Sequence, residues 1–133
     1  MNHVNLSAFA DWLGRYADAT GVDGAALARD QTLLINSVLC TFVHPAMGRD
    51  DIAAVLVDAG AIESPVDDHV LRTAMGRNLE NFLLGAPQFL FNSESQRLVI
   101  GQWFEFGEIE PAAIAPILDA LALQAQAWHR REE

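Results

Sequence analysis

The sequence contains no lysine, a single cysteine and no long apolar run. Eight arginines face 18 acidic residues, so the formal net charge is −10. A chain this acidic repels polyanions, which argues against nucleic acid and anionic membranes as partners. No apolar stretch approaches the roughly 18 residues that a membrane helix needs, and the N-terminus lacks a basic region followed by an apolar one. We therefore expect a cytoplasmic protein.

Motifs that carry chemistry are also missing. No two of the four histidines stand at helical spacing and there is no C-x-x-C pair, so we expect no metal or cofactor. No G-x-S-x-G elbow presents a nucleophile. Cys40 lies in an apolar run, which is typical of a small buried side chain. The chain is not expected to be an enzyme, although an acid–base pair among so many carboxylates stays open.

Apolar residues nevertheless make up 51% of the 133 residues. A chain of this length can bury a core that is stable without a disulfide or a structural metal. Without repeats or linkers, residues 1–133 are expected to form one domain. The hydrophobic fraction exceeds what one small core requires, so we expect some apolar surface to be meant for another protein.

Residues 5–20 have the apolar spacing of an amphipathic helix that ends at Gly21. Its stripe carries Phe9, Trp12 and Tyr16. Three aromatic side chains make it wider than packing on one sheet demands. Part of the stripe, with Trp12 at its edge, is therefore expected to remain exposed.

After this helix the helical period disappears, and short β-prone runs follow at 32–35, 38–43 and 52–57. Turn residues separate them at Asn36-Ser37 and at 45–50. This pattern predicts three antiparallel strands. The last run is rich in alanine and could be helical on propensity alone.

A second helix is expected from Ser64, where a capping hydroxyl precedes Pro65, to about Leu84. Its apolar residues cover more than half of the circumference, which is too much for packing on one layer. We therefore expect burial against a second subunit across a two-fold axis. The expected dimer contacts are Val70, Leu71, Met75, Leu79 and Phe82.

The segment 85–87 breaks this helix, and strands are expected at 89–91 and 97–106 around the polar turn 92–96. A last helix opens at Glu110-Pro111. The order α-β-β-β-α-β-β-α predicts an α+β fold, with a twisted antiparallel sheet flanked by helices.

Five segments carry a likeness to a known family: 6–21 as first helix, 32–36 with 38–44 as first strands, Arg77-Asn78-Leu79 late in the second helix, 89–91 with 97–100 as closing hairpin, and 114–128 as final helix. In this order and spacing the chain resembles the class I type III secretion chaperones, the CesT-like (Tir chaperone) family. It departs from the family's pattern at Ser37, where an aspartate-glycine turn is usual, and at the alanine-rich third strand.

The resemblance implies a homodimeric bacterial chaperone without ATPase activity. It would bind the N-terminal region of a secreted effector, hold it extended, and release it at the secretion apparatus. An extended segment can pair with a sheet edge and insert apolar side chains beside a helix. By this likeness the effector-binding residues are Leu6, Phe9, Trp12, Leu13 and Tyr16, with Leu33, Ile35 and Phe42.

Other interpretations stay open at this point. A helix stripe such as the first one is often plain core. An acidic α+β adaptor or regulatory protein unrelated to secretion could share the architecture, because fold does not fix function. A small enzyme with a polar pocket is the third class.

Overall fold

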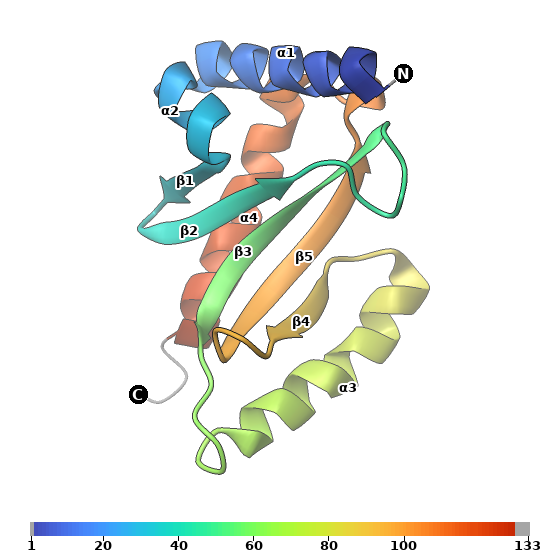
Figure 1. The fold of residues 1–133 in the computed structure, drawn as a ribbon. Coiled ribbons are helices and arrows are strands. Elements are labelled where there is room, and N and C mark those ends of the chain that lie inside the picture. The colour runs from blue at the N-terminus through green and yellow to red at the C-terminus, as the bar shows by residue number, and fades with distance from the viewer. Residues whose placement is uncertain (1, 130–133) are drawn as a thin grey trace.

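The computed structural model describes residues 2–129, with side chains from Ala8 onward. Figure 1 labels the elements, which follow one another as α1 (Asn2–Thr20), α2 (Gly24–Asp30), β1 (Thr32–Ile35), β2 (Val38–Val43), β3 (Ile52–Ala61), α3 (Asp68–Leu84), β4 (Gln88–Asn92), β5 (Arg97–Glu105), the 3-10 turn η1 (Phe106–Glu108) and α4 (Pro111–His129). No helix within this described range is long and apolar enough to cross a membrane.

The five strands form one sheet in the order β1-β2-β3-β5-β4, and every neighbouring pair is antiparallel. This confirms the predicted α+β class. Strand β3 is longer than predicted because a bulge between Asp58 and Gly60 lets its pairing with β5 continue to Ala61. The alanine-rich run is a strand, since its alternate side chains are buried: Ala53, Val55, Val57 and Ala59.

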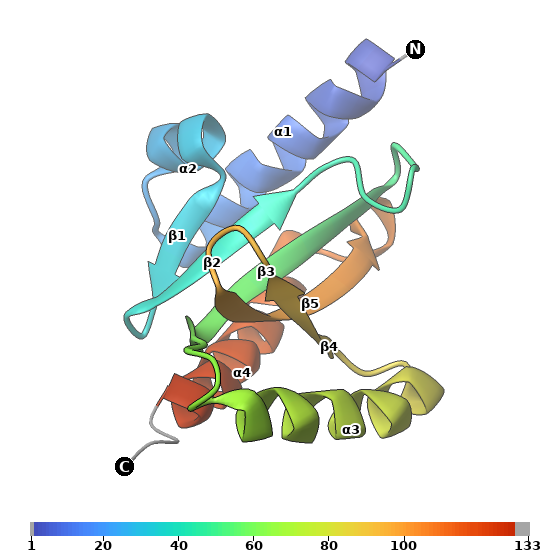
Figure 2. The same cartoon turned by 60° about the horizontal axis from the view of Figure 1, so that its bottom comes forward.

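Two helices cover one face of the sheet. Helix α4 packs mainly on β3, and α1 lies against α4 at the end of the sheet. In Figure 1, α4 lies behind the strands and no described helix crosses the face toward the viewer. We call the covered face the inner face and the other one the outer face. Helix α3 contacts β4 and lies beside the sheet, as the second view in Figure 2 also shows.

An aromatic cluster fills the space between α1 and the inner face. Phe9, Trp12 and Tyr16 stack along the helix and meet Phe42 of β2 edge-on. The indole N–H of Trp12 donates a hydrogen bond to the carbonyl oxygen of Ile109 at 3.0 Å. Burying this many rings gives α1 a large share of the core.

Helix α2 was not predicted from the sequence. It has only seven residues, too few for a periodic pattern to be visible. Its N-cap is Asp23, whose carboxylate accepts hydrogen bonds from the N–H groups of Ala25 and Ala26. Asp23, as a capping residue, was the feature of the sequence that could have indicated this helix.

Helix α3 begins at Asp68, so the start predicted at Ser64 is wrong. Residues 64–67 form turns, in which the N–H of Asp67 donates to the carbonyl oxygen of Glu63. The Asp67 carboxylate in return accepts the N–H of Glu63 at 2.9 Å. This side-chain to backbone bond is a local alternative to helical hydrogen bonding. The end is as predicted, with Gly85 in the left-handed conformation.

Candidate functional site

The aromatic stripe of α1 belongs to the core. Phe9, Trp12, Leu13 and Tyr16 are each at most 2% exposed. The expectation that part of the stripe is exposed is therefore wrong for these four residues. The stripe is wide because α1 packs on both β2 and the segment after β5, which places Trp12 under Ile109. While α1 stays in place, these side chains are not available to an effector.

The remaining predicted effector contacts have mixed positions. Phe42 is fully buried on the inner face. Leu33 and Ile35 of β1 also point inward and pack, partly buried, against the core. The side chain of Leu6 lies outside the described residues. None of the described residues predicted to contact an effector is freely exposed, so these assignments remain predictions that would require the chain to open.

Helix α3 presents the expected apolar surface, with one correction. Met75, Leu79 and Phe82 are 65%, 68% and 71% exposed, and Leu71 is partly buried. Val70 is 3% exposed because it points into the chain's own core, so it has no surface left for a partner. Single exposed apolar residues are ordinary, but a contiguous apolar face marks an interaction site.

The outer face of the sheet is a second uncovered apolar surface. It carries Leu34 of β1, Leu39 of β2, Leu90 of β4 and Trp103 of β5, of which Leu34 is 69% and Trp103 51% exposed. Strand positions alternate between the two faces, and these residues fall on the side opposite to α4. The strands are thus apolar on both faces, as is typical of sheets that are covered on both sides.

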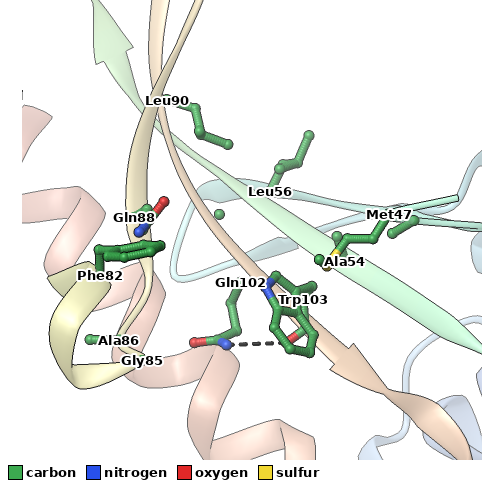
Figure 3. Close-up of a pocket in the computed structure, with 12 residues that line it drawn as sticks. Met47, Ala54, Leu56, Phe82, Gly85, Ala86, Gln88, Leu90, Gln102 and Trp103 are labelled. Atoms are coloured by element: carbon green, nitrogen blue, oxygen red, sulfur yellow. Dashed lines mark hydrogen bonds between the residues drawn. The ribbon is translucent and has the colours of Figure 1, made fainter. Parts of the chain in front are cut away.

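A hollow of about 520 Å³ opens on this face next to α3. Figure 3 shows Phe82 and Leu90 on one side of it and Met47 and Trp103 on the other. The hollow depends on the absence of a side chain at Gly101, because a Cβ at this position would lie 2.8 Å from Cδ1 of Leu90. The complete lining is Ala46, Met47, Ala54, Leu56, Phe82, Gly85, Ala86, Gln88, Leu90, Gly101, Gln102 and Trp103.

The sheet has two edges, and the β4 edge is closed. Asn78 of α3 donates from Nδ2 to the carbonyl oxygen of Phe89 at 2.8 Å and accepts the N–H of Phe89 at Oδ1 at 2.7 Å. The amide thus takes the place that a neighbouring strand would have. Since α3 also lies along β4, this edge offers little room for a further strand.

The β1 edge is open. The hairpin from β1 to β2 closes through Ile35 and Val38 around a two-residue turn, and the N–H of Phe42 donates to the carbonyl oxygen of Gln31. In an antiparallel pair, residues that are hydrogen-bonded to the partner strand alternate with residues whose N–H and carbonyl point away from it. Counted back from the bonded Ile35, Leu34 is of the second kind. The N–H and carbonyl of Leu34 therefore point outward, and no other described element bonds to them.

The polar groups of the chain are used structurally. Arg97 makes two hydrogen bonds of 2.7 Å to the carboxylate of Asp58, and His129 at the end of α4 lies 3.5 Å from it. Burial raises the pKa of Asp58, but the hydrogen bonds from Arg97 and the Gly60 N–H, with the nearby positive charges, outweigh burial and lower that pKa.

Cys40 is buried as expected, and burial raises its pKa to about 11.

Titratable side chains do not gather into a metal site in the described part of the chain, where no three His, Cys, Asp or Glu side chains stand close enough to hold one. What the structure brings together is apolar surface: the outer face, the hollow and the exposed side of α3. The sequence signal for the outer face was present, since Val38-Leu39-Cys40 is apolar at consecutive strand positions and so on both faces.

Solved structures share this fold. The chain is similar to a chain of the ExsC-ExsE complex, with a TM-score of 0.73 and 15% identity over 93% of this chain and 92% of that one. It is also similar to a chain of the HopA1-SchA chaperone-effector complex, with a TM-score of 0.72 and 11% identity over 96% and 97%. No protein-family model and no curated protein matches the sequence. The chain therefore has the fold of these two solved chains, one of which belongs to a chaperone-effector complex, and this agrees with the resemblance drawn from the order and spacing of its elements.

Proposed function

We propose that this chain is a type III secretion chaperone of the bacterial cytoplasm. It binds the N-terminal region of a secreted effector and keeps that region extended, without ATP and without catalysing a reaction. Its similarity to a chain of a chaperone-effector complex over nearly the whole length of both supports this role. So does its surface, which offers exposed apolar area and an open strand edge.

One observation carries the proposal: the open β1 edge adjoins an uncovered apolar face. An extended segment that pairs with β1 can bond to the outward N–H and carbonyl of Leu34. Its alternate side chains then lie over the outer face, where Leu34 and Leu39 are exposed. Backbone pairing gives affinity for many sequences, and pockets for alternate side chains give selectivity. The hollow beside Leu90 can take an apolar side chain of a segment that continues across the face.

The exposed side of α3 is proposed as the dimer contact. Met75, Leu79 and Phe82 lie at the β4 end of the molecule, whereas the open edge lies at the β1 end. A twin subunit on α3 would therefore leave β1 free for an effector. The net charge of −10 keeps two such apolar surfaces soluble.

Co-expression tests this proposal. The tagged chain is produced together with the product of an effector reading frame beside its own, and the purified material is examined by size-exclusion chromatography, light scattering and mass spectrometry. We expect a stable complex that contains two copies of this chain, in which the N-terminal region of the effector is protected from protease. A variant effector that lacks this region is the matched control and should not co-purify.

The adaptor interpretation predicts a different result. If only the homodimer is recovered with every effector candidate, or if the truncated effector binds as well as the intact one, the chaperone proposal is contradicted.

A further inference from the structure

Gly76 lies in the middle of α3, on its exposed side, and nothing in the chain requires a glycine there. A Cβ at this position would meet no atom within 4 Å. Its φ is not among the positive values, so the helical backbone suits any residue. Glycine weakens a helix interior relative to alanine, and this weakening has no compensation within one subunit. A residue without a side chain does let a second helix approach closely at that point.

Opposite charges flank Gly76 at equal distance. Arg72 precedes it by four residues and Glu80 follows it by four, so all three lie on one side of the helix. Both charged side chains are exposed, and neither forms an ion pair within the described chain. Of the five other arginines among the described residues, four have a carboxylate within 4 Å, and the guanidinium of Arg77 lies over the ring of Trp128.

A two-fold axis through Gly76 would bring these charges together. In an antiparallel pair of α3 helices that cross at Gly76, Arg72 of one copy faces Glu80 of the other, twice. In a parallel pair each charge would face its own copy and repel it. The exposed Met75, Leu79 and Leu83 lie beside this crossing and would be covered by it. A locally neutral contact also suits a chain whose overall charge makes its copies repel one another.

We propose that the partner of this face is a second copy of the chain, bound through antiparallel α3 helices that cross at Gly76, with reciprocal Arg72–Glu80 ion pairs. This inference rests on the homodimer of the proposed function and specifies its geometry. Charge complementarity about Gly76 favours this pairing, together with exposed apolar side chains that no described element covers.

Charge reversal tests the geometry. Sedimentation equilibrium of the full chain measures the dimer dissociation constant for the wild type, Arg72→Glu, Glu80→Arg and the double variant. Each single reversal should raise the constant about tenfold or more, because two facing pairs become repulsive. The double reversal should return it to within about threefold of the wild type. The two single changes shift the net charge in opposite directions, so net charge cannot explain a shared effect.

A change in the stability of α3 alone cannot explain the recovery of the dissociation constant in the double variant either. Glu at 72 stands four residues after Asp68, and Arg at 80 stands three after Arg77, so each single change adds a like-charge pair within α3. Both pairs remain in the double variant. Glu94→Arg, in the exposed turn between β4 and β5, makes the same charge change as Glu80→Arg away from α3 and should leave the constant unchanged.

A second variant probes the crossing point. Gly76→Leu should keep a cooperative unfolding transition, since open space surrounds the position, but should raise the dissociation constant about tenfold or more. If the wild type is dimeric and neither single reversal weakens it, or the double variant is not rescued, this geometry is overturned while the homodimer stands. If the wild type is monomeric at micromolar concentration, the homodimer of the proposed function fails as well.

Discussion

The side-chain amide of Asn78 bonds to both backbone groups of Phe89, with Nδ2 to O at 2.8 Å and N to Oδ1 at 2.7 Å. One side chain of α3 therefore makes the two backbone hydrogen bonds that a neighbouring strand would make to Phe89 at the β4 edge. This relationship fastens α3 to the sheet and leaves β1 as the edge at which a further strand can add.

Asn78→Ala should lower the free energy of unfolding by about 2 kcal/mol, because it leaves the N–H and carbonyl of Phe89 without partners in a partly buried place. Asn78→Asp should also destabilise the chain, since its carboxylate can accept the N–H but sets a second acceptor oxygen against the carbonyl of Phe89. Urea unfolding measures both. Equal stability of Asn78→Ala and the wild type would show that water replaces the amide without loss.

Two of the three tryptophans, Trp12 and Trp103, form a matched pair for stability. Trp12→Ala should lower the free energy of unfolding by about 3–5 kcal/mol, because the indole is 1% exposed and its N–H is bonded to Ile109. Trp103→Ala should change it by less than about 1 kcal/mol, since that ring is half exposed on the outer face. Calorimetric melting checks both. A small effect at Trp12 would mean that α1 does not pack as described.

Asp58 gives the stability a pH dependence. Its pKa is lowered in the folded state, so its contribution is present above the unfolded value of about 3.9 and is lost as the pH falls through the lower, folded value. Asp58→Asn should therefore be about 1 kcal/mol less stable than the wild type at pH 7. This difference should shrink at pH 3. A gap that stays constant from pH 7 to pH 3 would contradict the ion pair with Arg97.

Leu34→Pro separates backbone pairing from side-chain contact at the open edge. The N–H of Leu34 points away from β2, so its removal breaks no bond of the sheet, and proline is tolerated on an edge strand. The variant should stay folded but bind an effector segment about tenfold more weakly or worse. Leu34→Ala is the control for the lost side chain, because it keeps the N–H, and it should bind more tightly than Leu34→Pro.

Affinities for that comparison come from fluorescence anisotropy with a labelled effector segment. Equal binding by Leu34→Pro and Leu34→Ala would exclude strand addition at β1 and would assign the affinity to apolar contacts alone.

Most elements could be predicted from the sequence because their patterns are local. Turn-forming residues mark the ends of the strands at Asn36-Ser37 and at 92–96, and the structure has a hairpin at each place. Helix α2 is too short for periodicity, and β3 continues past Val57 only because the bulge after Asp58 restores its register. Such features depend on the partner strand, which a single segment does not specify.

The partner surface was harder to predict, because periodicity reports only that a side chain avoids water. Trp12 and Met75 both belong to over-wide apolar faces, yet Trp12 is buried by its own chain and Met75 is 65% exposed. Which face closes on the core depends on packing between distant segments, such as that of Trp12 with Ile109. The prediction of surplus apolar surface from the sequence is therefore correct, but part of that surface was placed on α1, whose aromatic stripe is buried.

The central claim is that the chain binds an extended effector segment on its own, and isothermal titration calorimetry tests it most directly. The purified protein is titrated, without nucleotide, with a peptide from the N-terminal region of the effector encoded beside it. We predict a dissociation constant of about 1 µM or lower, with a negative heat-capacity change from apolar burial. Absence of binding at about 100 µM peptide, or binding that needs ATP, would contradict the claim.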